Sequence, residues 1–116
     1  MDFHTLCTGC RTYRRFKQKQ IPEEILDELL ENARIANSAM NGQPLRYVLV
    51  KTSEAVRKIQ PCFHFAAALP KELGQPKEGE QPAAFIILCT EGPETPWTSI
   101  DIGIAVRTMN LNAYIH

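Results

Sequence analysis

Hydrophobic positions recur most regularly between residues 21 and 37, in the run IPEEILDELLENARIAN. Their spacing of three and four residues is that of a helix with one apolar face. Pro22 suits a first helical position, and the acidic residues that follow it suit the positive end of the helix dipole. We therefore predict an amphipathic helix that ends near Asn37, with an apolar face formed by Ile25, Leu26, Leu29, Leu30, Ala33 and Ala36.

Two shorter apolar runs predict strands. The first is LRYVLVK, residues 45–51. The second is AAFIILCT, residues 83–90, which is apolar almost without alternation, as a strand buried on both faces would be. Cys89 lies inside this second run, and we expect it to be an inert core residue.

The last run, TSIDIGIAVRTMNLNAYIH, carries apolar residues nearly all round a helix. This pattern predicts a deeply buried helix over residues 98–116. Asp101 stands on this otherwise apolar surface. A carboxylate there must be paired or must face an interface, because burying an unpaired charge is costly.

Turn and cap signals separate these elements. Asn41-Gly42 and the following Pro44 predict a turn before the first strand. Thr52 or Ser53 can cap a short helix through EAVRKI, and the polar residues 71–82 predict a surface loop. The element order predicts one α+β domain over residues 1–116, with a central sheet flanked by helices.

Composition fits one ordinary globular domain, with 44% hydrophobic residues and a net charge of zero over 116 residues. No run approaches the roughly 20 apolar residues of a membrane helix, and the first residues, MDFHTL, lack the apolar core of a signal peptide. We therefore expect a cytoplasmic protein that does not bind membranes. No Walker loop, Ser-His-Asp order or paired-carboxylate pattern points to a kinase or a hydrolase.

Positive charge is concentrated near the N-terminus, in the stretch CTGCRTYRRFKQK, residues 7–19, which contains no acidic residue. A nucleic-acid-binding domain more often has a basic balance throughout, with a pI above about 9. The sequence pI here is about 6.8. A compact anion such as a phosphate group therefore suits this stretch better than a nucleic acid.

The motif CRTYRRF, the acidic helix, ARIANSAMNGQPLRYVLV and the final helical run together resemble the FMN-dependent nitroreductase family. In that family a pattern close to R-R-S-x-R-x-F precedes a helix, and A-R-x-A-P-S-x-x-N-x-Q-P-W-x-F leads into the first long strand. The resemblance implies a nitroreductase-like fold and a homodimer with FMN at the subunit interface. It also implies ping-pong transfer of hydride from NAD(P)H to a planar acceptor such as a nitroaromatic or a quinone.

The resemblance assigns roles to residues of both motifs. Arg11 and Thr12 would bind the FMN phosphate, and Arg14 would face the phosphate or the pyrimidine edge of the ring. The turn after the acidic helix would lie along the isoalloxazine, and no side chain would be catalytic because the chemistry takes place at flavin N5. The turn positions that match are Asn37, Ser38, Ala39 and Asn41.

The residues alone also allow simpler interpretations. The arginines can form the solvated face of an N-terminal helix, which is the arrangement we expect for Arg15, Lys17 and Lys19. Likewise, the turn can be an ordinary helix C-terminus followed by Asn41-Gly42.

The sequence departs from the family pattern at three motif positions and in length. Cys10 stands where many members have another phosphate-binding Arg, Asn37 where many have Pro, and Leu45 where Trp is frequent. The family fold also continues beyond the last helix seen here, so we expect a truncated domain that lacks the family's C-terminal portion. A non-catalytic flavin-binding protein is therefore an alternative function.

The cysteines offer a third alternative, a small thiol or zinc protein. Cys7 and Cys10 have C-x-x-C spacing, and Cys62 lies two residues from His64. Such spacing is unspecific, and we expect His64 to be a packed residue and the protein to hold no metal.

Overall fold

The computed structural model describes all 116 residues. The chain forms two compact units. The first unit contains Met1–Arg11, Pro22–Val48 and Leu88–His116. The second unit contains Thr12–Ile21 and Leu49–Ile87.

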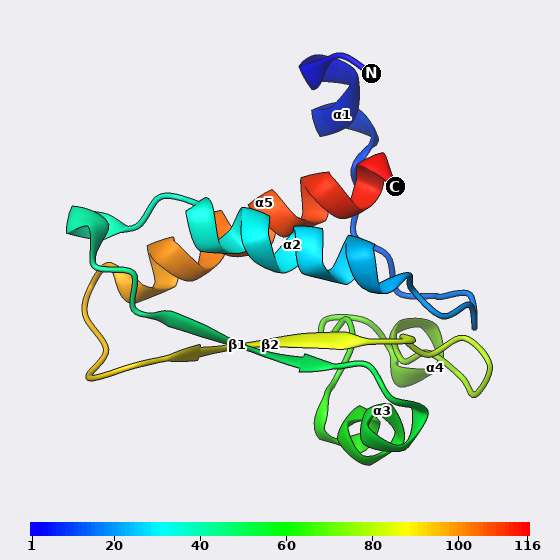
Figure 1. Cartoon of the computed structure of the whole chain (residues 1–116). Coiled ribbons are helices and arrows are strands. Elements are labelled where there is room, and N and C mark those ends of the chain that lie inside the picture. The colour runs from blue at the N-terminus through cyan, green and yellow to red at the C-terminus, as the bar shows by residue number, and fades with distance from the viewer. The chain divides into compact units, whose positions relative to one another are not determined.

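The core of the first unit lies between helix α2, Glu23–Ile35, and helix α5, Thr98–Ile115, which run side by side in Figure 1. The predicted amphipathic helix is confirmed, although Pro22 caps it and the helix ends two residues before Asn37. Each helix buries one stripe with three- and four-residue spacing, as ridges-into-grooves packing requires. These stripes are Leu26, Leu29 and Ala33 on α2, and Thr98, Asp101, Ala105, Met109 and Asn112 on α5.

The rest of α5 is not deeply buried, so that prediction was wrong for this chain. Ile100 is 52% exposed and Ile115 is 57% exposed. An all-round apolar pattern does not specify which faces have neighbours, and one packed helix covers only one stripe of another.

Helix α1, Phe3–Gly9, begins at Asp2, whose carboxylate accepts the Thr5 N–H at 3.0 Å. It ends close to the C-terminal part of α5 (Figure 1). A Cβ atom on Gly9 would lie 2.3 Å from the Tyr114 hydroxyl oxygen, so the absence of a side chain at Gly9 permits this contact. Beside it, the Cys10 thiol is 3.4 Å from the Asn110 carbonyl oxygen.

Strands β1, Leu45–Val50, and β2, Phe85–Thr90, pair in a two-stranded antiparallel sheet, which confirms both predicted strands. At one end of the pair, the Glu91 N–H donates to the Pro44 carbonyl oxygen at 2.9 Å. However, β2 is mostly half-buried and Cys89 is exposed, which contradicts the expected core position. In a two-stranded sheet each strand is an edge strand, so an apolar run does not ensure cover on both faces.

The second unit contains helix α3, Ser53–Ile59, the 3₁₀ turn η2, Gln60–Cys62, and helix α4, Lys71–Gly74. Of the two predicted caps, Thr52 and Ser53, Thr52 is the one used, because its hydroxyl accepts the Ala55 N–H at 3.2 Å. Part of the predicted loop is instead α4, a helix of one turn that starts after Pro70. His64 is exposed, contrary to its predicted packing, whereas Phe63 beside it stacks on Phe85 with ring centroids 5.1 Å apart.

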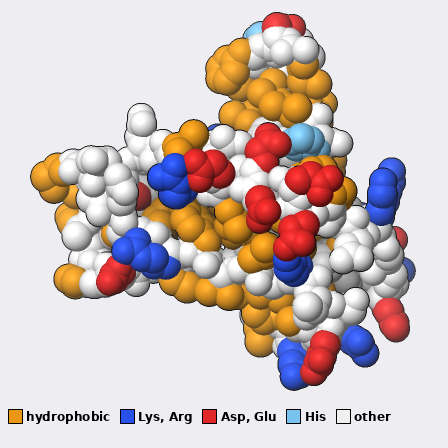
Figure 2. All heavy atoms as spheres, viewed as in Figure 1, with side chains coloured by type: hydrophobic (Ala, Val, Ile, Leu, Met, Phe, Trp, Pro, Cys, Tyr) orange, Lys and Arg blue, Asp and Glu red, His pale blue; other side chains and the backbone are white.

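Acidic side chains gather over the outward face of α2, as Figure 2 shows. They come from Glu23, Glu24, Asp27, Glu28 and Glu31, all of which are exposed. None of the helices combines the length and the hydrophobicity that a membrane crossing requires.

Candidate functional site

Two arginines of the N-terminal motif have free side chains. Arg11 is the last residue of the segment Met1–Arg11 in the first unit, whereas Thr12 and Arg14 belong to the second unit. All three are exposed, and neither guanidinium makes an ion pair or a hydrogen bond within the chain. Residues 10–22 form no helix or strand, so neither Arg11 nor Arg14 lies on a helical face.

Arg15 is different, because its side chain binds other parts of the second unit. Its Nε lies 3.0 Å from the Glu80 carboxylate, and its Nη2 donates to the Leu73 carbonyl oxygen at 2.9 Å. Its Nη1 is 3.4 Å from the Gly74 carbonyl oxygen, at the last turn of α4. The prediction that Arg15 is merely solvated is therefore wrong, whereas Lys17 and Lys19 are exposed as predicted.

The turn between α2 and β1 has an unusual backbone. Met40, Asn41 and Gln43 have φ angles of 51°, 54° and 49°, in the left-handed region. Gly42, by contrast, is right-handed with φ of −67°. The predicted Asn41-Gly42 turn is thus present, but side-chain-bearing residues take the left-handed positions, which costs free energy at each.

Short hydrogen bonds hold this turn, which contains the 3₁₀ turn η1, Ala39–Asn41. The Gln43 N–H donates to the Ser38 hydroxyl at 3.0 Å, and the Gln43 side-chain amide donates to the Asn41 side chain at 2.8 Å. The Asn41 N–H donates to the Ser38 carbonyl at 3.0 Å. From helix α5, Asp101 Oδ1 accepts the Ala39 N–H at 3.0 Å.

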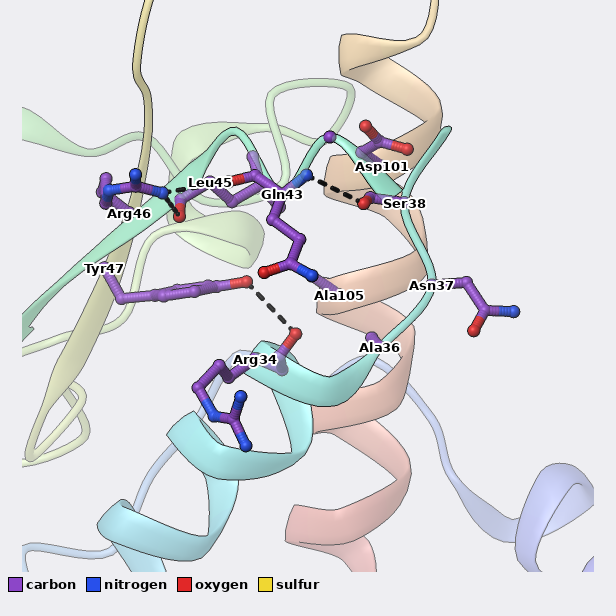
Figure 3. Close-up of a pocket in the computed structure, with 12 residues that line it drawn as sticks. Arg34, Ala36, Asn37, Ser38, Gln43, Leu45, Arg46, Tyr47, Asp101 and Ala105 are labelled. Carbon is purple, nitrogen blue, oxygen red and sulfur yellow. Dashed lines mark hydrogen bonds between the residues drawn. The ribbon is translucent and has the colours of Figure 1, made fainter. Parts of the chain in front are cut away.

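A pocket of about 320 Å³ lies beside this turn, entirely within the first unit (Figure 3). Figure 3 shows the Gln43 side chain and the Tyr47 ring directed toward the middle of the pocket, while the Asn37 side chain points away from it. The pocket is lined by Ala33, Arg34, Ala36, Asn37, Ser38, Gly42, Gln43, Leu45, Arg46, Tyr47, Asp101 and Ala105.

The two arginines that line the pocket are each paired with a carboxylate. Arg34 binds Glu31 through two hydrogen bonds of 2.7 and 2.6 Å, and Arg46 is paired with Glu91. The Tyr47 hydroxyl donates to the Ala33 carbonyl at 3.4 Å, and burial raises the pKa of Tyr47. The pocket therefore offers hydroxyl, amide and apolar surfaces, which suit a planar, hydrogen-bonding ligand.

The predicted turn residues come together at this pocket. Asn37 and Ser38 line it, and Ala39 and Asn41 continue the same turn without lining it. The prediction did not include the pocket positions of Gln43, Tyr47 and Asp101. The signal for Asp101 was its charge on an apolar helix, and its carboxylate accepts a hydrogen bond from the Ala39 N–H.

The cysteines do not assemble a metal site. Cys7 is half-buried, Cys10 is buried, and all four cysteines are free thiols. No group of three or more His, Cys, Asp or Glu side chains is arranged to hold a metal ion. The zinc alternative therefore has no ligand cluster in this structure.

A family model described as "Nitroreductase family" matches residues 8–115. The chain belongs to the nitroreductase family. The matched residues include both motifs, so the resemblance inferred from the sequence is confirmed.

Curated relatives share part of this nitroreductase-family chain. A protein of Stutzerimonas stutzeri (strain A1501), named "Putative NADH dehydrogenase/NAD(P)H nitroreductase", is 34% identical over 59 residues, covering 51% of this chain and 30% of the relative. A protein of Methanothermobacter thermautotrophicus with the same name is 29% identical over 84 residues, covering 72% and 39%. The chain thus spans about a third of the length of the curated relatives it matches.

Solved nitroreductases share the fold. A nitroreductase family protein from Clostridium difficile 630 aligns with a TM-score of 0.72 at 21% identity, covering 97% of this chain and 62% of that one. A nitroreductase with bound FMN from Bacteroides fragilis NCTC 9343 aligns with a TM-score of 0.69 at 24% identity, covering 97% and 65%. These alignments confirm the predicted nitroreductase-like α+β fold.

Proposed function

We propose that this chain binds FMN. We also propose that it forms part of a cytoplasmic enzyme, which transfers hydride from NAD(P)H to a planar acceptor such as a nitroaromatic or a quinone. The single observation that carries the proposal is the contrast within the arginine motif. Arg15 is bound to the protein, whereas Arg11 and Arg14 keep every guanidinium donor available for an anion. Family membership makes the FMN phosphate the best candidate for that anion.

We assign different donors of this chain to the two ends of FMN. Arg11, Thr12 and Arg14 supply cationic and hydroxyl donors, which a phosphate dianion requires. Asn37, Ser38, Ala39 and Asn41 lie on a turn whose backbone is held in a defined shape by hydrogen bonds within residues 38–43 and by the bond to Asp101. Small side chains at Ser38 and Ala39 permit close approach of a flat ring.

When bound, FMN supplies the hydride chemistry, because its N5 accepts and donates hydride. The role of the protein is to bind and orient the cofactor. A cation at Arg14, if held near the pyrimidine edge, favours negative charge on the ring and so raises its reduction potential. We further propose a homodimer and a ping-pong cycle, in which NAD(P)H and the acceptor use the same site in turn.

Absorption spectroscopy and FMN titration test this proposal. The wild-type protein should bind FMN, seen as shifted flavin absorption and quenched fluorescence. Arg14→Ala should weaken FMN binding by at least about tenfold, because a charge-assisted hydrogen bond contributes about 1.5 kcal/mol or more. Lys19→Ala is the matched control, since it removes an exposed charge from the same stretch, and it should change the Kd less than about twofold.

The outcomes separate the proposed steps. Wild-type protein that does not bind FMN would refute the proposal. Equal losses in Arg14→Ala and Lys19→Ala would show that only general charge matters. FMN binding without oxidation of NADH or NADPH in the presence of a quinone would favour the non-catalytic, flavin-binding alternative.

A further inference from the structure

Asp101 is a buried carboxylate without a cationic partner. It is 4% exposed, and no Lys, Arg or His side chain pairs with it. Its position in the first turn of α5 is favourable, because the positive end of the helix dipole lies there. Its one hydrogen bond to another segment is the 3.0 Å bond from the Ala39 N–H, 62 residues away in sequence.

The turn that Asp101 contacts is strained. Met40 and Asn41 both have left-handed φ angles, of 51° and 54°. Such conformations persist only where surrounding contacts enforce them. The other bonds of Ala39–Asn41 come from within residues 38–43, so Asp101 provides the hydrogen bond that ties this turn to a rigid helix.

We propose that Asp101 is the positioning residue that holds Ser38–Asn41 in the conformation that binds the flavin ring. This inference rests on the proposed function. Asp101 does not itself touch the cofactor in this mechanism. It accepts the Ala39 N–H and thereby fixes the start of the left-handed segment, so that the turn is shaped before any ligand arrives. A preshaped turn binds its ligand more tightly because less conformational entropy is lost on binding.

The test compares variants that keep or remove the acceptor. Asp101→Asn keeps a side-chain oxygen of the same size and position. Asp101→Ala and Asp101→Leu remove the acceptor, and the leucine also fills the space, so that one acceptor-free variant retains the packing. Asp27→Ala removes an exposed acid from α2 and controls for lost charge.

The first readout needs no flavin. Hydrogen exchange of the Ala39 N–H, followed by NMR, should be slow in wild type and in Asp101→Asn. It should be about tenfold faster or more in both acceptor-free variants, since the hydrogen bond protects this amide. Thermal unfolding of each variant, followed by circular dichroism, checks that the fold is kept.

The second readout is the FMN Kd. It should rise by about tenfold in the acceptor-free variants, because these variants lack the one hydrogen bond that shapes the turn before FMN binds. Asp101→Asn should restore most of the affinity. Adding Met40→Gly to Asp101→Ala should also restore part of it, because glycine takes the left-handed conformation without a steric cost.

Each result decides between the interpretations. Unchanged Ala39 exchange in Asp101→Ala and Asp101→Leu would overturn the positioning role, as would an Asp101→Asn variant that binds FMN as weakly as they do. If exchange responds as expected but wild type fails to bind FMN, the proposed function is refuted while the anchoring of the turn stands.

Discussion

Replacing Arg15 by alanine tests whether the segment that carries Thr12 and Arg14 is held by specific contacts. In the second unit, Arg15 links this segment to two others through its side chain, and the Phe16 N–H adds a bond to the Glu80 carbonyl oxygen at 2.9 Å. It reaches the Glu80 carboxylate at 3.0 Å and the Leu73 carbonyl at 2.9 Å. Arg15→Ala removes both contacts, together with the longer 3.4 Å contact to Gly74.

The magnitude follows from the exposure and the distances of these contacts. The Arg15 and Glu80 side chains are 38% and 47% exposed, so their ion pair contributes only about 0.5 kcal/mol after solvent screening. A charged donor at good distance from a carbonyl contributes about 1.5 kcal/mol, and the 3.4 Å contact adds little. The total loss in the free energy of unfolding should be about 2 kcal/mol.

Urea unfolding measures this loss directly. With a slope of about 2 kcal/mol per molar urea, the unfolding midpoint should fall by about 1 M. Arg15→Lys keeps the charge but cannot reproduce the forked contacts, so it should lose more than half as much. Glu80→Gln should cost only about 0.5 kcal/mol, because it leaves the carbonyl contacts intact. A loss below about 0.5 kcal/mol in Arg15→Ala would refute the reasoning, since Arg15 would then be a solvated charge.

Two further predictions concern α2. Leu26→Ala should lower the free energy of unfolding in urea by about 3 kcal/mol, because Leu26 is 3% exposed. Ile35→Ala on the same helix should lower it by less than about 1 kcal/mol, because Ile35 is 60% exposed. Equal losses would contradict the packing of α2 on α5. A hydrogen bond from Asn112, and a weaker one from His116, lower the pKa of Glu28 in the folded protein. The ionised Glu28 side chain therefore stabilises the fold above the unfolded pKa of about 4.3. This stabilisation is lost as the pH falls through the lower folded pKa. As the pH is lowered from about 7 to about 3, the urea midpoint of Glu28→Gln should therefore fall less steeply than that of wild type. Parallel plots of midpoint against pH for the two proteins would contradict this linkage.

The sequence determined the elements that depend on local signals. The spacing of Leu26, Leu29 and Ala33 predicted both α2 and its buried face, because helical periodicity fixes which side chains share a side. Thr52 and Ser53 together predicted the start of α3, since a hydroxyl before a helix satisfies a free N–H, and Thr52 forms this bond. Both strands were also placed within two residues of their observed ends. The family motifs were readable because they depend on residue order alone.

Only the tertiary structure decided which side chains are free and which are engaged. Arg14 and Arg15 are identical in type and adjacent in sequence, yet the Arg15 side chain binds residues 58 to 65 positions away and the Arg14 side chain binds none. Cys89 looked like a core residue, but exposure depends on how many neighbouring segments cover a strand. Asp101 and Ala39 are 62 residues apart in sequence, and the packing of α5 against α2 brings them within hydrogen-bonding distance. Local patterns carry no information about such long-range contacts, because those contacts form only when separate elements meet in the folded chain.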